Sequence, residues 1–324
     1  MQKWGDSPHF NPIQNTLKTK YPEQPLQTRI LALRNNIHSV LHGQNEAVEI
    51  AIICFLASGH LLIEDVPGVG KTTLASAFAQ SLGLKHQRIQ FTSDILPSDI
   101  LGVNIYNPKT CEFTFHQGPI FTHILLADEI NRAEPRAQSA LLEAMFERQV
   151  SVDGTTYTLP KPFMVIATQN PVDFSGTFPL PDSQLDRFLF RISMGYPDED
   201  AERAILRSHA QKPAVTPVLT PEDIETLHNA VNTIHASEDI ENLILKIVHA
   251  TRHHALIAQG ASTRAMIDLM QAAKARALVH QRDFVLPEDI IQLAPLALAH
   301  RIRLVARANI DAYTLLESRI LSNL

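Results

Sequence analysis

The chain has 324 residues, of which 45% are hydrophobic and 19% are charged, and its formal net charge is −6. This composition is typical of a globular protein, and the length suggests two domains. The negative charge argues against nucleic acid and anionic membranes as partners, and the two cysteines argue against a disulfide framework or a zinc cluster.

The N-terminal segment is polar and broken by prolines, and it lacks the apolar core of a signal peptide. We therefore expect a flexible tail over residues 1–25. No stretch approaches about eighteen consecutive apolar residues, so the sequence predicts no membrane-spanning helix. Together with the low cysteine content, these features favour a location in the reducing cytoplasm.

Residues 26–196 have the pattern of an α/β domain. Two predicted helices surround a break at residues 42–44, and short apolar runs then alternate with helical stretches. The runs expected to form buried strands are HLLIED, HQRIQF, HILLADE, PFMVIATQN and RFLFRI. Alternating strands and helices imply a parallel sheet with helices on both faces.

Two segments within this domain are predicted to be β-hairpins. Residues 102–117 contain two β-rich runs around Asn107-Pro108, and residues 149–160 contain an Asp153-Gly154 turn. Neither segment fits a simple strand–helix–strand unit, so we expect both to be insertions. After Tyr196 the pattern becomes helical, which predicts a small helical domain at 197–304 and a C-terminal helical segment at 305–324.

The stretch EDVPGVGKTT, residues 64–73, nearly matches a phosphate-binding loop. Asp65 stands where that pattern has its first glycine. The positions at which the backbone must approach an anion closely are nevertheless Gly68 and Gly70, while Asp65 tolerates a turn and Pro67 stiffens it. The alternative is a glycine-rich turn that carries a surface lysine.

The residues that follow the glycines support nucleotide binding. Lys71 is expected to reach the β- and γ-phosphates of ATP, and the Thr72 hydroxyl is expected to bind Mg²⁺. An apolar strand precedes the loop and a predicted helix follows it, as the motif requires. The expected phosphate-binding residues are Pro67, Gly68, Val69, Gly70, Lys71, Thr72 and Thr73.

Polar residues end the next two core strands. Asp128 and Glu129 follow ILLA, and Asn170 follows VIATQ. Ligands bind at the carboxyl ends of parallel strands, so we assign Asp128 to Mg²⁺ through water and Glu129 to the general base. Asn170 would orient the attacking water. Taken alone, the acidic pair is better explained by a strand that ends in a solvated helix cap, and Asn170 is a weak signal because Asn commonly ends strands. The phosphate loop about sixty residues earlier favours the functional interpretation of the acidic pair.

Two arginines are candidates for stabilising charge in the transition state. Arg187, in LDRF, could act on the nucleotide of a neighbouring subunit, or it could be a surface residue paired with Asp186. Arg264 opens a predicted helix in the second domain. From there it could reach back to the γ-phosphate and report hydrolysis.

The order of these motifs resembles that of AAA+ ATPases, and more narrowly that of the MoxR family. The resemblance rests on the phosphate loop, the Asp-Glu strand, the Asn strand, LDRF, and STRA in the helical part, and it runs from about residue 26 to residue 303. It implies a sheet of order 5-1-4-3-2 followed by a helical lid. It also implies that Gly43 and Gln44 pack beside adenine, and that the hairpins face a ring pore or a substrate.

The same resemblance implies a ring, commonly a hexamer, with ATP at the subunit interfaces. Such proteins remodel clients, including in metal or cofactor insertion, and often act with a partner that has a von Willebrand factor A domain. Two other functions stay open at this point. One is a motor directed by nucleic acid, and the other is a scaffold that binds ATP without useful turnover.

Overall fold

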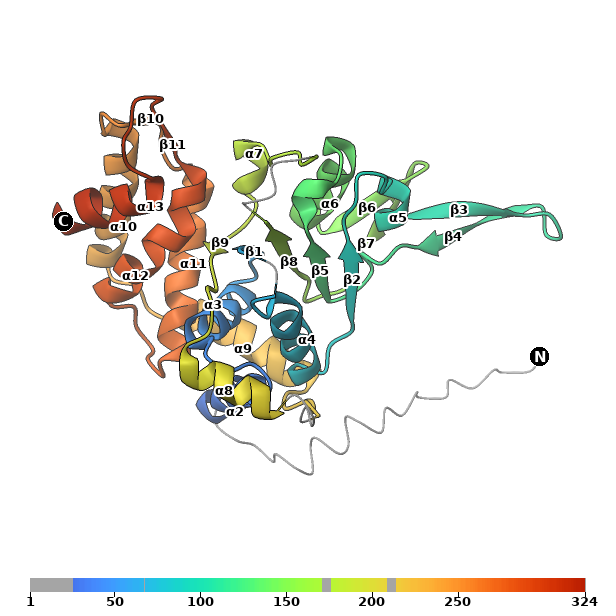
Figure 1. Cartoon of the computed structure of the whole chain (residues 1–324), viewed down its shortest axis with the longest axis horizontal. Helices are drawn as coiled ribbons and strands as arrows, with labels where there is room; N and C mark the ends of the chain where they lie inside the picture. Colours follow the sequence, from blue (N-terminus) through green and yellow to red (C-terminus); the bar gives the residue numbers. More distant parts are fainter. Residues whose placement is uncertain (1–25, 67, 171–175, 209–213, 324) are drawn as a thin grey trace.

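The computed structural model describes residues 26–66, 68–170, 176–208 and 214–323. The tail predicted at 1–25 and Pro67 of the predicted loop lie outside the described residues. A central sheet with flanking helices forms the middle of the molecule, with the C-terminal helices on one side and a long hairpin extending from the other (Figure 1).

The central sheet is parallel and has the order β2-β5-β8-β1-β9. Numbered by core strand, this is the 5-1-4-3-2 order, which is confirmed. The residues of β5 are all buried, as are nearly all of those of β1 and β8, which fits their central positions. The strands are β1 Leu61–Glu64, β2 His86–Gln90, β5 Ile124–Asp128, β8 Met164–Gln169 and β9 Phe190–Ile192.

Helices cover both faces of the sheet because alternate residues of each strand point to opposite sides. Leu61 and Ile63 of β1 belong to the apolar cluster shared with α3 and α4, whereas Leu62 belongs to the cluster shared with α6. The first cluster continues from α3 into the C-terminal helices α11 and α12. The helices of the α/β part are α2 Leu26–His38, α3 Asn45–Leu56, α4 Lys71–Ser81, α5 Pro97–Leu101, α6 Pro135–Glu147 and α7 Asp182–Leu185, with a 3₁₀ turn η1 Ile130–Arg132.

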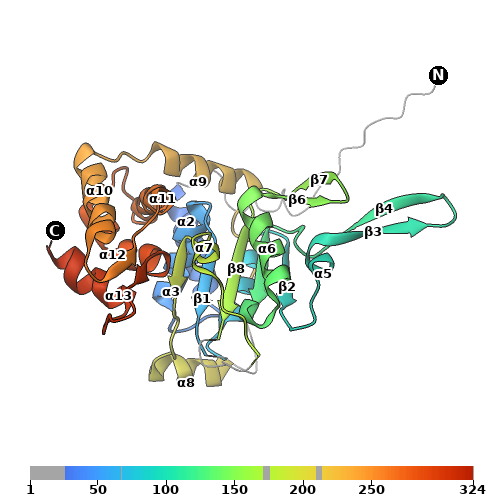
Figure 2. The same ribbon diagram turned by 90° about the horizontal axis from the view of Figure 1, so that it is seen from above.

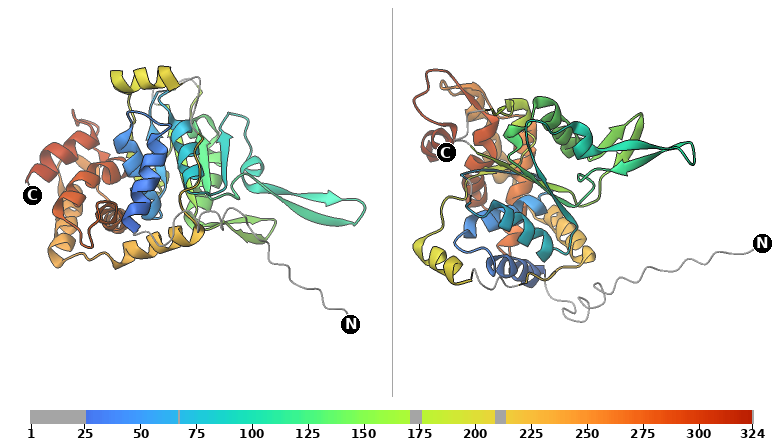
Figure 3. Two further views of the ribbon diagram at one scale, coloured as in Figure 1. Left: turned by 90° about the horizontal axis from the view of Figure 1, so that it is seen from below. Right: turned by 45° about the vertical axis from the view of Figure 1, so that its right-hand side comes forward.

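Both predicted hairpins are confirmed. Strands β3 Gly102–Asn107 and β4 Glu112–Gln117 pair in antiparallel register and project far from the body, as the teal arm in both views of Figure 3 shows. Strands β6 Gln149–Val152 and β7 Thr155–Thr158 form the shorter hairpin. Its turn residues, Asp153 and Gly154, both have positive φ, as the sequence of this tight turn requires.

The chain after β9 is mostly helical. Pro221 and Pro287 occupy the first turns of their helices, and the Thr220 hydroxyl accepts a hydrogen bond from the Asp223 N–H. Two short antiparallel strands, β10 Ile257–Gln259 and β11 Arg303–Leu304, also lie here, where only helices were expected. The helices are α8 Glu199–Ser208, α9 Pro221–Thr233, α10 Glu238–His253, α11 Thr263–Val279, α12 Pro287–Leu298 and α13 Ala312–Leu315, and the short turns are η2 Ala299–Arg301, η3 Leu316–Ile320 and η4 Leu321–Asn323.

Candidate nucleotide-binding site

The candidate phosphate loop connects the end of β1 to the first residue of α4. Gly68 and Gly70 have φ of +90° and +103°, a left-handed conformation that glycine adopts without steric cost. Gly70 caps α4, so the backbone N–H groups of the first helical turn are available to an anion. Val69 is buried, whereas Thr72 is exposed on the first turn.

Lys71 lies between the loop and the acidic strand ends. Its side chain is buried, and its Nζ donates a hydrogen bond to the Asp65 carbonyl oxygen at 2.8 Å. Burial lowers the pKa of Lys71, while the nearby carboxylates of Asp128 and Glu129 oppose that shift. The sequence motif and the acidic pair therefore meet in space.

Asp65, the departure from the phosphate-loop pattern, has a defined structural role. Its Oδ1 accepts a hydrogen bond from the Val66 N–H at 2.7 Å. Its Oδ2 accepts from the Ser193 hydroxyl at 3.0 Å, and from the N–H groups of Met194 and Gly195 at 2.7 Å each. Burial alone would raise the pKa of this carboxyl, but these hydrogen bonds outweigh burial and lower it.

Gly43 and Gln44 lie against the same segment that Asp65 binds. Gln44 Nε2 donates to the Gly195 carbonyl at 3.1 Å. Gly43 has φ of +72°, and a Cβ at this position would come within 2.6 Å of the Ala201 Cβ. A larger residue would therefore displace the start of α8. The predicted adenine-side residues are thus tied through residues 195–201 to the phosphate loop.

The acidic pair ends β5, and Thr168 of the neighbouring strand fixes it. The Thr168 hydroxyl donates to Asp128 Oδ1 at 2.6 Å and accepts from the Glu129 N–H at 2.9 Å. Arg88 of β2 donates to the other Asp128 oxygen at 2.7 Å. Glu129 has φ of +55°, which turns the chain sharply after the strand. Sequence reasoning missed Thr168, although a lone hydroxyl in a buried apolar strand was a usable signal.

The Glu129 carboxylate is held toward the edge strand β2. Its Oε2 accepts hydrogen bonds from Gln90 Nε2 at 2.9 Å and from Arg132 Nη1 at 3.1 Å. Sequence reasoning missed both partners, because the register that pairs Gln90 with Asp128 is not visible in the sequence. Asn170 follows β8 at the same edge of the sheet, and its carbonyl accepts a hydrogen bond from the Asn131 amide at 3.3 Å.

Arg187 lies at the amino-terminal ends of the strands, opposite to the carboxyl ends that carry the phosphate loop and the acidic pair. It precedes β9, whose first residue, Phe190, pairs with Leu61, the first residue of β1. The phosphate loop follows the other end of β1. The Arg187 guanidinium donates to the Leu142 carbonyl at 2.6 Å and forms no ion pair within the described parts of the chain. The expected alternative, a pair with Asp186, is not formed.

Arg264 lies in the same region as Arg187. Its guanidinium carbon is 4.3 Å from the centre of the Phe146 ring, near the end of α6, and its Nη1 is 3.7 Å from Asp186 Oδ2. These contacts lie at the amino-terminal edge of the sheet rather than at the phosphate loop, and the expected reach of Arg264 to the γ-phosphate stays a prediction.

Comparisons with known proteins agree with this geometry. Residues 60–190 match the model of the ATPase family associated with various cellular activities (AAA), and residues 249–319 match an AAA lid domain. The chain is 40% identical to Chaperone MoxR1 of Mycobacterium tuberculosis, covering 85% of this chain and 76% of that protein. It belongs to the MoxR family of AAA ATPases.

Other relatives of this MoxR-family chain extend the likeness. It is 49% identical to the uncharacterized protein YeaC of Bacillus subtilis, covering 85% of this chain and 87% of that protein. A crystal structure of a candidate ATPase from Cytophaga hutchinsonii superposes with a TM-score of 0.86 at 37% identity, covering 96% and 97% of the two chains.

Membership of this family implies ATP as the nucleotide. Among the described residues of the MoxR-family chain, no helix has the length and apolarity needed to span a membrane. The same residues contain no group of three or more His, Cys, Asp or Glu side chains that could hold a metal ion.

Proposed function

We propose that this MoxR-family chain hydrolyses ATP to ADP and phosphate and uses the reaction to remodel client proteins. The observation that carries the proposal is the meeting of Lys71, Asp128 and Glu129 at one edge of the sheet, beside the amino terminus of α4. The name of the relative Chaperone MoxR1 supports the remodelling part.

Each residue at this edge has a distinct role in the proposal. Lys71 leaves the Asp65 carbonyl and donates to the β- and γ-phosphates. Glu129 leaves Gln90 and Arg132 and takes a proton from the attacking water as general base. Asn170, at the end of the adjacent strand, orients that water. The contacts that Glu129 gives up are at the protein surface, so their loss costs little.

The side chains present also fit a magnesium ion held together with the nucleotide. Mg²⁺ prefers oxygen ligands and is usually bound by one or two carboxylates plus phosphates rather than by a protein cage. The exposed Thr72 hydroxyl would supply one of these oxygens directly, and the Asp128 carboxylate would hold the ion through water. When bound, the ion would neutralise negative charge on the phosphates.

The position of the arginines favours a ring in which neighbouring chains share a site. Arg187 and Arg264 lie at the edge of the sheet opposite to the phosphate loop, so they can serve a nucleotide only on another copy. A closed ring of head-to-tail contacts brings these two edges together in every pair of neighbours. We propose a hexamer, which is the stoichiometry implied by the family resemblance.

The client and partner follow from the same family reasoning. We propose a cytoplasmic client whose maturation includes metal or cofactor insertion, and a partner with a von Willebrand factor A domain. The Glu129→Gln variant, which would bind ATP without cleaving it, is suited to capture both. Recovery of no such partner with that variant from the native cytoplasm would remove this part of the proposal.

A phosphate-release assay tests the hydrolysis itself. Lys71→Ala should abolish both ATP binding and turnover, because it removes the charge that contacts the phosphates. Lys246→Ala, at an exposed position on α10, is the matched control and should turn over like the parent. An inactive parent, or an active Lys71→Ala variant, would contradict the proposal. Strong stimulation by duplex DNA would instead favour a motor directed by nucleic acid.

A further inference from the structure

A large cavity lies at the amino-terminal edge of the sheet, on the side away from the phosphate loop. Its volume is about 720 Å³, which is within the range of small-molecule sites. Its walls come from the end of α3, the approach to β8, and helix α9. In Figure 2, α9 lies at the same end of the sheet as the cavity, and α8 lies at the opposite end. Asp65 of the phosphate loop is hydrogen-bonded to Gly195, shortly before α8, so the loop belongs to that opposite end.

One wall of the cavity is cationic and has no counter-charge. The half-buried Arg148 guanidinium donates to the carbonyl oxygens of Ser58, at 2.6 Å, and of Phe163. Neither Arg148 nor Lys161 forms an ion pair among the residues that the structure describes. The Arg148 guanidinium is half-buried and the Lys161 side chain is exposed, so both cations can be reached by an anion that enters the cavity from outside the chain.

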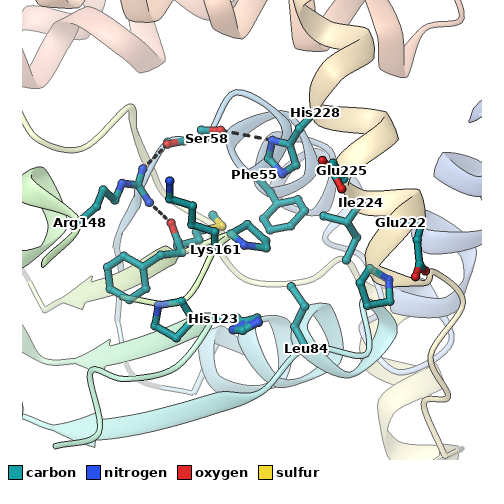
Figure 4. Close-up of a pocket in the computed structure, with 16 residues that line it drawn as sticks. Phe55, Ser58, Leu84, His123, Arg148, Lys161, Glu222, Ile224, Glu225 and His228 are labelled. Atoms are coloured by element: carbon teal, nitrogen blue, oxygen red, sulfur yellow. Dashed lines mark hydrogen bonds between the residues drawn. The ribbon is translucent and has the colours of Figure 1, made fainter. Parts of the chain in front are cut away.

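The rest of the lining is apolar or neutral. Phe55 and Leu84 form an apolar floor between the cationic wall and α9 (Figure 4). Burial lowers the pKa of His123 and of His228, so both imidazoles are uncharged at neutral pH. The lining acids, Glu222 and Glu225, are exposed on α9, across the cavity from Arg148.

We propose that this cavity binds a small organic anion, with its charged end at Lys161 and Arg148 and its apolar body against Phe55 and Leu84. Such a ligand would contact both the sheet edge and α9, which itself packs on α11 of the lid. The site is separate from the phosphate loop and does not depend on nucleotide binding.

Calorimetric titration with naphthalenesulfonate tests the proposal on the full chain. The parent should bind one molecule per chain, and Lys161→Glu should weaken binding about tenfold or more, because an attracting charge becomes a repelling one. Lys109→Glu, the same change on the distant β3–β4 turn, should bind like the parent. The uncharged naphthalenesulfonamide should bind about tenfold more weakly than the sulfonate.

Two further variants keep the test decisive. Leu84→Trp places a bulkier ring on the apolar floor, where the body of the probe is proposed to lie, and should weaken binding about tenfold. Lys71→Ala should bind the probe normally, even though it no longer binds ATP. Absence of binding to the parent overturns the proposal, as does parent-like binding to Lys161→Glu or to Leu84→Trp. If Lys71→Ala no longer binds naphthalenesulfonate, the probe binds at the phosphate loop rather than in the cavity, and this result would also overturn the proposal.

Discussion

The two edges of the central sheet use charge in different ways. At the carboxyl edge, acids and cations pair directly: Arg88 with Asp128, and Arg132 with Glu129, through arginine side chains that are 51% and 50% exposed. At the amino edge, Arg148 and Arg187 donate to main-chain carbonyls instead, while Arg264 lies over the Phe146 ring and 3.7 Å from an Asp186 oxygen.

This difference implies that charged side chains can change partners at the carboxyl edge, the rearrangeable edge, whereas arginines bonded to main-chain carbonyls are held in place at the amino edge, the fixed edge. Ion pairs with an exposed partner are worth little, about 0–1 kcal/mol for fully exposed pairs, so both acids can release their arginines when a nucleotide and water bind. Arginines held by main-chain carbonyls keep their direction, which suits groups that must meet a ligand on another molecule.

Glu129→Gln should reduce hydrolysis by about 10³-fold, because the amide cannot accept the proton of the attacking water. Its affinity for ATP should remain close to that of the parent, since the phosphate loop is unchanged. Phosphate release and calorimetry measure the two quantities. A variant that hydrolyses as fast as the parent would show that the chemistry of the carboxyl edge does not depend on this carboxylate.

Arg264→Ala should reduce hydrolysis by about 10²-fold if the amino edge serves the nucleotide of a neighbour. An equimolar mixture of Arg264→Ala and Lys71→Ala chains should then recover about a quarter of the parent rate, because some interfaces combine two intact edges. A mixture of Lys71→Ala and Glu129→Gln is the control. Both changes lie at the same edge, so no interface is repaired, and recovery there would disprove the division between edges.

Asp65→Asn should lower the free energy of unfolding by about 2 kcal/mol at pH 7, because an amide NH₂ would face N–H donors. The pKa of Asp65 is lowered in the folded chain, so its contribution is complete above the ordinary aspartate range. It is lost as the pH falls through the lowered value. Urea unfolding should therefore show the gap between parent and variant closing below about pH 4.

The matched control for this pH dependence is Asp283→Asn, at an exposed position. It should change the free energy of unfolding by less than about 0.5 kcal/mol at both pH 7 and pH 3. A parent–variant gap at Asp65 that stays constant from pH 7 to pH 3 would show that the carboxylate does not hold the loop through its charge. Packing, and not the charge of Asp65, would then hold the phosphate loop against residues 193–195.

Arg88→Ala should change the hydrolysis rate by less than about fivefold, because the Arg88 side chain of this pair is half exposed and Asp128 keeps its hydrogen bond from Thr168. The rate and its salt dependence measure this effect. A loss of tenfold or more would show that Arg88 is part of the catalytic edge. In that case the contrast between a rearrangeable and a fixed edge would not hold at β2.

Much of the carboxyl edge was predictable from the sequence because its signals are local. The two loop glycines adopt positive φ, and the acids end their strand as expected. The strand order came from the family resemblance rather than from residue patterns. The roles of Glu129, Asn170 and the arginines remain predictions.

What the sequence did not reveal depends on contacts between distant segments. The partners of Asp65 lie about 130 residues further along the chain, and no spacing rule connects them. Gln90 and Arg88 meet the acids only through the register of β2 against β5. The place of Arg264 is set by how α11 packs, which a helical period cannot specify. The cavity, likewise, is formed by segments that are far apart in sequence.

The apolar cluster shared by α3, α11 and α12 has a consequence for how the molecule comes apart. Since the C-terminal helices bury their side chains in the same hydrophobic core as the sheet, they have no separate core that would let them unfold independently. Heat or denaturant should therefore unfold the α/β part and the C-terminal helices in one cooperative transition. Any motion between them in the native state should be a sliding of packed helices rather than a free hinge rotation.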